Sequence, residues 1–174
     1  MSSRAKENRP GKRFSRFTAG LSGKGFLCSN RIGIDCHVVT YLTDANVLSE
    51  AVKTEPSEKV LDWLRRNENE IVVDPIILGE IEFGILLLSK SKRRQRLEEW
   101  FEQIVNHIYC LPWEAATGRR WAKLLARLRT SGSALPIKDS MIAATALANG
   151  LTVATRNTRD FRTAGVPVVN PFAR

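Results

Sequence analysis

With 174 residues, 43% of them hydrophobic and 26% charged, the chain is long enough to form one globular domain with its own core. Its longest apolar runs, such as residues 142–148, are too short to span a bilayer, and its three cysteines lack the spacing of a disulfide framework or a zinc site, which favours a cytoplasmic setting. The net charge of +9 favours polyanionic partners, although solubility alone would also account for it.

The N-terminal part of the chain differs from the rest in charge and in pattern. Residues 1–38 hold eight Lys and Arg against two acids, and residues 1–31 lack apolar periodicity. We therefore expect a basic, disordered extension over residues 1–37 and a single domain over residues 38–174. The extension is also loosely compatible with an organelle transit peptide, and translation starting at Val38 or Val39 would leave it out.

Short apolar runs alternate with helical patterns along the rest of the chain. The runs predict five strands, at residues 38–42, 71–73, 108–111, 151–154 and 166–169. Helical patterns between them cover residues 46–53, 57–66, 75–88, 97–105, 114–130 and 136–149. This alternation predicts an α/β fold, specifically a three-layer α/β/α sandwich with a mainly parallel central sheet.

Three helix ends carry specific signals. Asp74 and Pro75 have the residue types of an N-cap and a first helical position, and Pro136 similarly opens a later helix. Gly150 is expected to end that later helix as a C-cap. The helix that follows Asp74 is apolar nearly all round, which predicts that it is buried.

Acidic residues fall at or near the junctions between strands and helices. Asp44 follows the first strand, Asp139 lies in a first helical turn, and Asp160 follows the fourth strand. Each has an ordinary explanation, as an N-cap, a favourable first-turn acid or a turn residue. A further acid, Glu80 or Glu82, lies among apolar helical neighbours, where a charge must pair with Lys or Arg, reach solvent or bind another partner.

Taken together, the acids indicate a shared site at one edge of the sheet. Parallel strands place their sites at their carboxyl ends, so these side chains are expected at one edge of the sheet. Without a cation, repulsion would raise their pKa values, whereas Mg²⁺ or Mn²⁺ prefers such oxygen ligands. Metal-assisted hydrolysis of a phosphodiester follows from this chemistry. The two histidines, His37 and His107, do not suggest a Ser/His/Asp arrangement.

Four segments, taken in order, resemble one known family. They are YLTDANVLSE at residues 41–50, GEIEFG at 79–84, LPIKDSMIAATALANGLTVATRNTRDF at 135–161 and VPVVNPF at 166–172. From about residue 38 to residue 172 the chain resembles the PIN-domain family, and within it the VapC-like toxin ribonucleases of type II toxin–antitoxin pairs.

The resemblance implies a role for several side chains. It implies three metal-binding acids, Asp44, Glu80 and Asp139, and so a structural role for Glu82. Asn46 and Thr155 match residues that support the acids through hydrogen bonds. A fourth acid is common in the family, but the matching position here is Asn157. Either metal affinity is weaker as a result, or Asp160 takes over the catalytic role.

The resemblance also implies an activity and partners. The implied activity is that of a Mg²⁺- or Mn²⁺-dependent endoribonuclease that cleaves RNA, often a tRNA. The implied partners are a cognate antitoxin that blocks the enzyme and a second copy of the chain in a homodimer. Basic residues available to RNA phosphates are Lys90, Lys92, Arg93, Arg94, Arg119, Arg120 and Arg156, although each basic segment could equally be a solvated face. Two other functions stay open: a PIN domain that binds RNA without cutting it, and an α/β phosphatase with Asp44 as its nucleophile.

Overall fold

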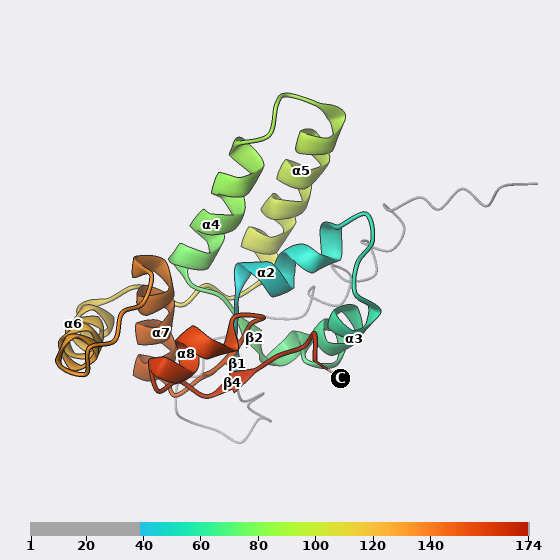
Figure 1. Ribbon diagram of the computed structural model, residues 1–174. Helices are drawn as coiled ribbons and strands as arrows, with labels where there is room; N and C mark the ends of the chain where they lie inside the picture. The colour runs from blue at the N-terminus through green and yellow to red at the C-terminus, as the bar shows by residue number, and fades with distance from the viewer. Residues whose placement is uncertain (1–38, 174) are drawn as a thin grey trace, which may run out of the picture.

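The central feature of the computed structural model, which describes residues 39–173, is a sheet of parallel strands (Figure 1). The strands are β1 (Tyr41–Thr43), β2 (Ile71–Val72), β3 (Thr152–Ala154) and β4 (Val168–Val169). They are ordered β2-β1-β3-β4, and all three neighbouring pairs are parallel. The predicted α/β fold with a parallel sheet is therefore confirmed.

The strand order determines where a site can form. From β1 the chain moves outward to β2, and it then returns past β1 to β3 and β4. Because such crossovers are right-handed, connections that run in opposite directions place their helices on opposite faces of the sheet. The direction changes between β1 and β3, and open parallel sheets bind ligands beyond the carboxyl ends of the strands at that point.

Helices surround the sheet and extend beyond it. They are α2 (Ala45–Leu48), α3 (Glu58–Arg66), α4 (Pro75–Leu86), α5 (Lys92–His107), α6 (Ala115–Thr130), α7 (Ile137–Asn149) and α8 (Thr158–Thr163), with 3₁₀ turns η1 (Ser49–Val52) and η2 (Glu68–Glu70). Helices α3 and α7 lie on opposite sides of the strands, while α4 and α5 form a hairpin that projects from the sheet (Figure 1).

Local sequence signals explain several helix ends. Asp74 is the N-cap of α4 and accepts hydrogen bonds from the backbone N–H groups of Ile76 and Ile77, each at 3.0 Å. Gly150 ends α7 with a φ of +66°, a left-handed conformation that glycine adopts without steric cost. Both caps were predicted from the sequence.

Two expectations about the elements are wrong. Residues 108–111 do not form a full strand, because they contribute only an isolated bridge between Val73 and Cys110. Helix α4 is not buried on all sides: Ile77, Ile81 and Ile85 are buried, but Phe83 and Leu87 are 60% and 70% exposed. An apolar helix sequence does not by itself say which face the rest of the fold covers.

The core lies between the sheet and the helices on either side of it. Its fully buried side chains include Leu42 of β1, Val153 of β3, Ile142 of α7 and Phe161 of α8. On the side of α3, Tyr41 packs edge-to-face against Trp63, with ring centroids 5.0 Å apart. This packing holds β1 and β3 rigidly, and with them the residues that follow each strand.

Candidate active site

Asp44 lies immediately after β1, and its carboxylate is oriented by residues from the neighbouring strand. Its side chain is buried, and Oδ2 accepts hydrogen bonds from Thr155 Oγ1 at 2.6 Å and from Asn46 Nδ2. Although Asp44 occupies the N-cap position of α2, its side chain makes no capping hydrogen bond. N-capping therefore does not explain this carboxylate, and the predicted supporting role of Thr155 and Asn46 matches the geometry.

The supporting residues are themselves held in place. Asn46 Oδ1 accepts a hydrogen bond from the backbone N–H of Arg156 at 3.2 Å, and Thr155 Oγ1 accepts one from that of Asn157 at 3.0 Å. The loop after β3 is thus tied to α2, the short helix that follows β1. Both segments flank the point where the strand order reverses.

Glu80 reaches the same region from α4. Its carboxylate pairs with the ammonium of Lys138, the residue just before Asp139. The Glu80 side chain is 21% exposed and that of Lys138 is 57% exposed. Pairing with a lysine was one of the ordinary explanations open for Glu80, but this lysine belongs to the same group of site residues. Glu82, by contrast, is exposed.

Asp139 and Asp160 are joined through Asn157. The amide Nδ2 of Asn157 donates to Asp139 Oδ2 at 3.1 Å and to Asp160 Oδ2 at 2.8 Å. Asn157 and Asp160, the two alternatives for the fourth group, therefore lie side by side at the same site. Asn157 donates hydrogen bonds to both carboxylates, and Asp160 provides a carboxylate next to the position where the sequence has Asn157.

The electrostatics confirm that these acids crowd one another. Burial, followed by the charges of Asp44, Asp160 and Glu80, raises the pKa of Asp139 to about 6. Burial likewise raises the pKa of Asp44, and Glu80 adds to that effect despite the hydrogen bond from Thr155. In Lys138, the hydrogen bond to Glu80 raises the pKa of the ammonium. The acids thus form one negatively charged cluster that favours binding of a cation.

The donor set fits a hard divalent cation. Asp44, Glu80, Asp139 and Asp160 offer only carboxylate oxygens, the ligands that Mg²⁺ and Mn²⁺ prefer. Among residues 39–173, no three Asp, Glu, His or Cys side chains are gathered tightly enough to hold one ion as they stand. In this structure the Lys138 ammonium neutralises part of the negative charge by pairing with Glu80. A cation that binds at the acids therefore competes with Lys138 for the Glu80 carboxylate.

Sequence reasoning missed Lys138, and it gave Asp74 only a capping role. Asp74 is fully buried, and burial raises its pKa. Its Oδ2 accepts a hydrogen bond from Thr145 Oγ1 at 2.7 Å, and Thr145 accepts one from Trp113 Nε1 at 3.0 Å. This chain of bonds joins the start of α4 to α7, which carry Glu80 and Asp139. The position of Lys138 directly before the predicted site acid Asp139 was the sequence signal that could have identified it.

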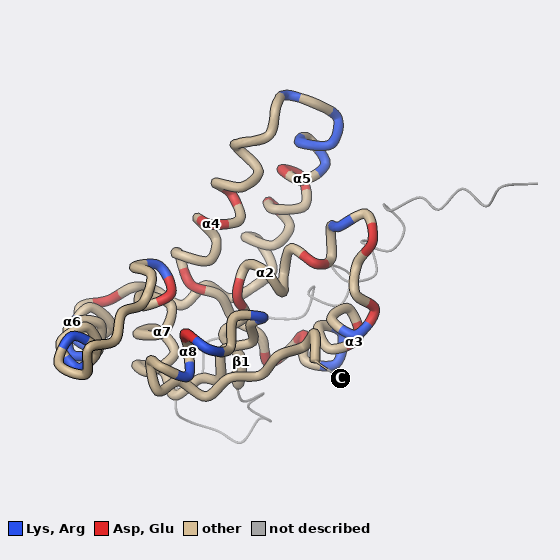
Figure 2. Tube along the Cα trace, in the orientation of Figure 1, with Lys and Arg blue, Asp and Glu red and all other residues tan. Residues whose placement is uncertain are grey.

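The predicted RNA-binding residues occupy different surroundings. Those of residues 90–96 lie in the turn between α4 and α5 and at the start of α5, away from the sheet (Figure 2). There Arg94 pairs with Glu98 and donates to the carbonyls of Leu86 and Leu88. Lys90, Lys92, Arg93, Arg119 and Arg120 are exposed. Arg156 lies 3.7 Å from the buried Glu50 and packs over the Phe172 ring. Their contact with RNA stays a prediction.

Comparison with known proteins decides the family. A model of the PIN domain matches residues 41–166. The chain belongs to the PIN-domain family. The acids and their supporting residues described above all lie within the matched part.

PIN-domain relatives resemble the chain over most of its length. VapC ribonuclease Y4jK of Sinorhizobium fredii is 37% identical over 135 residues, which are 74% of this chain and 95% of the relative. The crystal structure of FitAcB from Neisseria gonorrhoeae has a TM-score of 0.70 and 31% identity, and covers 78% of this chain and 100% of its own.

A more distant structure adds a toxin–antitoxin context. It is that of VapBC-5 from Mycobacterium tuberculosis, a member of the VapBC family of toxin-antitoxin systems, with a TM-score of 0.51 and 27% identity; it covers 57% of this chain and 81% of its own. The predicted resemblance to VapC-like PIN-domain proteins is confirmed. In the described part of the chain, no helix is long and apolar enough to cross a bilayer. The predicted extension over residues 1–37 lies outside the described residues.

Proposed function

We propose that the protein is a Mg²⁺- or Mn²⁺-dependent endoribonuclease that acts as the toxin of a toxin–antitoxin pair. The observation that carries the proposal is the convergence of four acids at the carboxyl edge of β1 and β3, with Asp44 held by Thr155. A PIN-domain relative of 37% identity named as a ribonuclease supports the same activity.

Each residue has a defined part in this proposal. Asp44, Glu80 and Asp139 would hold the divalent cation, which when bound makes water more acidic and neutralises charge on the phosphate. Thr155 and Asn46 orient the Asp44 carboxylate through the hydrogen bonds described above. Asn157 keeps Asp160 beside Asp139, so that Asp160 can orient or deprotonate the attacking water.

The partners follow from the same family relationship. The similarity to a toxin–antitoxin structure supports a cognate antitoxin as the partner that blocks the site. RNA, with tRNA as the first class to test, is the proposed substrate, and the cytoplasm is the corresponding location. A homodimer is the expected assembly.

A specific observation keeps one alternative in view. Asn157 stands where many family members have an acid, and its N–H groups already occupy Asp139 and Asp160. A domain that binds RNA without cutting it would show this feature. The phosphatase alternative lacks support of this kind, because the residue two positions after Asp44 is Asn46, which donates to Asp44 instead of supplying an acid.

Cleavage of a total tRNA pool by purified, antitoxin-free protein tests the proposal. We expect cutting with Mg²⁺ or Mn²⁺ that stops with EDTA and in Asp139→Asn. RNA that is bound but never cut, with either metal, would instead establish the binding domain.

A further inference from the structure

A cavity of about 260 Å³ lies on the side of the molecule formed by α6, α7 and α8. Helix α6 contributes Arg120, Lys123, Leu124 and Arg127, while Leu147 of α7 and Ala164 and Gly165, just after α8, line the rest of it. Every charged side chain in this lining is a cation, whereas Leu124, Leu147 and Ala164 form an apolar part of the wall. The charged groups of the cavity therefore favour an anion.

The cations of the cavity are not neutralised by carboxylates. Within residues 39–173, Arg120, Lys123 and Arg127 take part in no ion pair. Arg127 donates to the Ala164 carbonyl, and Arg120 donates to the Leu147 carbonyl at 3.5 Å. A guanidinium has five N–H donors, so capping these helix ends leaves most of the donors of each arginine available.

Helix α6 differs in this respect from the other basic segment. It holds five cations and no acid, whereas α5 follows its four Lys and Arg with Glu98, Glu99 and Glu102. In α5, Glu98 pairs with Arg94. A solvated surface helix usually mixes charges as α5 does, so the unmixed charge of α6 needs another explanation.

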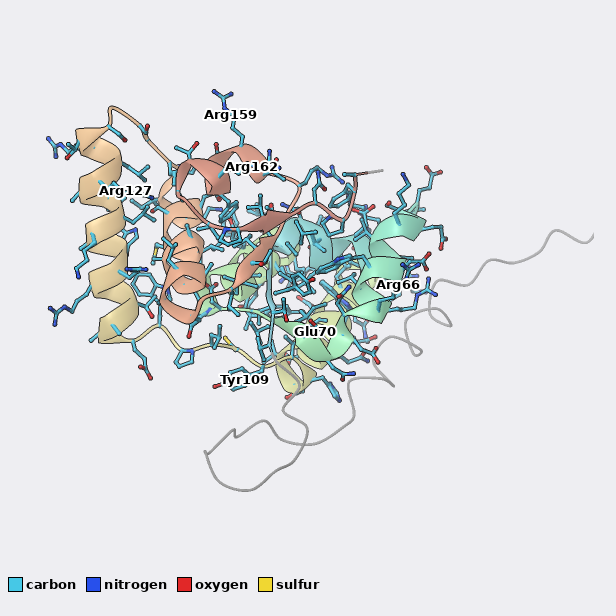
Figure 3. The ribbon with its side chains drawn as sticks, turned by 90° about the horizontal axis from the view of Figure 1, so that it is seen from below. Arg66, Glu70, Tyr109, Arg127, Arg159 and Arg162 are labelled. Carbon is cyan, nitrogen blue, oxygen red and sulfur yellow. The ribbon has the colours of Figure 1, made fainter. Side chains whose placement is uncertain are left out.

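The shape of the cavity depends on Gly165. This residue has a φ of +74°, and a Cβ added there would lie 3.2 Å from Arg127 Nη1. Glycine thus lets the chain turn after α8 while the Arg127 guanidinium packs against its backbone. Figure 3 shows Arg127 on the side of α6 that faces α7 and α8, with Arg159 of α8 pointing outward.

Two helices connect the cavity to the acids. Asp139 lies in the first turn of α7 and Leu147 lies eight residues further along, about 12 Å at 1.5 Å per residue. Helix α8 starts next to Asn157, carries the exposed Arg159 and Arg162, and ends at Thr163, just before Ala164. A strand of nucleic acid leaving the acids along α8 would therefore reach the cavity within a few nucleotides.

We propose that the cavity between α6, α7 and α8 binds a backbone phosphate of the RNA substrate, outside the group that is cut. This inference rests on the proposed ribonuclease function, because it names a second contact for the same substrate. It predicts that affinity for longer RNA depends on Arg120 and Lys123, and that the affinity for a dinucleotide confined to the acids does not.

The test compares two variants that lose the same charge. Arg120→Gln/Lys123→Gln removes two cations of the cavity, and Lys59→Gln/Arg66→Gln removes two exposed cations of α3, which does not line it. Arg127 is left intact because it also supports the chain after α8. Both variants are made in the full chain carrying Asp139→Asn, and thermal unfolding checks that they fold. Binding of a fluorescent single-stranded RNA of about 20 nucleotides is measured over a range of salt concentrations.

The expected result is specific to the cavity. Arg120→Gln/Lys123→Gln should weaken RNA binding severalfold and reduce the slope of log K against log salt by about 0.7 for each RNA phosphate that the variant no longer neutralises. Lys59→Gln/Arg66→Gln should change both much less, and a dinucleotide should bind all proteins alike. Equal effects of the two variants, or none, would overturn the proposal.

Further measurements distinguish RNA from other anionic ligands of the cavity, and RNA binding from RNA cleavage. Inorganic phosphate or a poly-glutamate peptide that distinguishes the two variants while RNA does not would also overturn the assignment to RNA. Cleavage is measured separately, with metal and intact Asp139. RNA bound through the cavity but not cut would uphold the phosphate contact and overturn the nuclease, whereas cutting by wild type with equal RNA affinity in both variants would uphold the nuclease and overturn the phosphate contact.

Discussion

Thr155 Oγ1 donates a hydrogen bond to Asp44 Oδ2 at 2.6 Å, although the two residues are 111 positions apart in the chain. They follow β1 and β3, the adjacent strands between which the sheet order reverses. The backbone N–H of Asp44 also donates to the carbonyl of Ala154 at 3.0 Å. The Asp44 carboxylate is therefore positioned by the sheet itself and not by a mobile loop.

The first prediction concerns this hydrogen bond. Thr155→Val should lower metal affinity or cleavage about 10- to 100-fold, because groups that orient metal-binding carboxylates typically contribute that much. Thr155→Ser keeps the hydroxyl and should retain most of the activity. Manganese titration and the initial rate of RNA cleavage measure the two effects. Full activity in Thr155→Val would show that the orientation of Asp44 does not depend on Thr155.

The second prediction concerns the acids themselves. Asp44→Asn, Glu80→Gln and Asp139→Asn should each reduce cleavage to background while leaving the fold intact, because each removes one charge from the proposed metal site. Glu82→Gln is the matched control, since Glu82 lies on α4 beside Glu80 but is exposed. Cleavage assays paired with circular dichroism separate loss of activity from loss of fold. Three fully active acid variants would mean that the site lies elsewhere.

The third prediction concerns Lys138. Its ammonium pairs with Glu80, so Lys138→Met should free that carboxylate and increase Mn²⁺ affinity by up to about fivefold, the effect of a largely exposed ion pair. Lys138→Arg preserves the charge and should bind Mn²⁺ like wild type. Isothermal titration with Mn²⁺ measures the difference. Weaker binding by Lys138→Met would indicate that the lysine assists metal binding instead of competing with it.

The fourth prediction is a pH dependence of metal-free stability. The pKa of Asp139 is about 6 in the folded protein against a usual 3.8, so ionising it costs folding free energy as pH rises through this interval. In EDTA, Asp139→Asn should therefore melt at a higher temperature than wild type at pH 7–8, by about 2–4 °C per kcal/mol regained. The gap should narrow as pH falls from about 6 towards 4.

Its control is Glu82→Gln, which changes the net charge equally at an exposed position. An Asp139→Asn variant whose melting temperature differs from that of wild type by the same amount at every pH would contradict the electrostatic explanation. Differential scanning calorimetry across this pH range provides the measurement.

The fifth prediction tests the buried hydrogen bonds behind the site. Valine has nearly the same shape as threonine, but Thr145→Val removes a hydrogen-bond partner of the buried Asp74 and of the half-buried Trp113. We expect a loss of about 1–3 kcal/mol for the buried Asp74 carboxylate and less for Trp113. Thr145→Ser keeps the hydroxyl and should be much less destabilising. Urea denaturation gives both free energies of unfolding. Equal stability of Thr145→Val and wild type would show that water replaces the missing hydroxyl.

Local signals were sufficient for part of this structure. The capping residues Asp74 and Gly150, and the acids that follow the strands, could be predicted because each depends on a few neighbouring residues. The prediction of a strand at residues 108–111 was wrong because a short apolar run does not say how many of its residues will pair with a neighbouring strand. The exposed face of α4 was missed for a similar reason, since burial depends on what packs against a helix.

By itself the sequence determined the α/β fold, the positions of Asp44, Glu80, Asp139 and Asp160 along it, and the family resemblance. Only the tertiary structure decided what these residues meet. Lys138 lies beside Glu80, Asn157 lies between Asp139 and Asp160, and the basic cavity is lined by residues of α6, of α7 and of the turn after α8. Such contacts follow from strand order and helix packing, which no local pattern specifies.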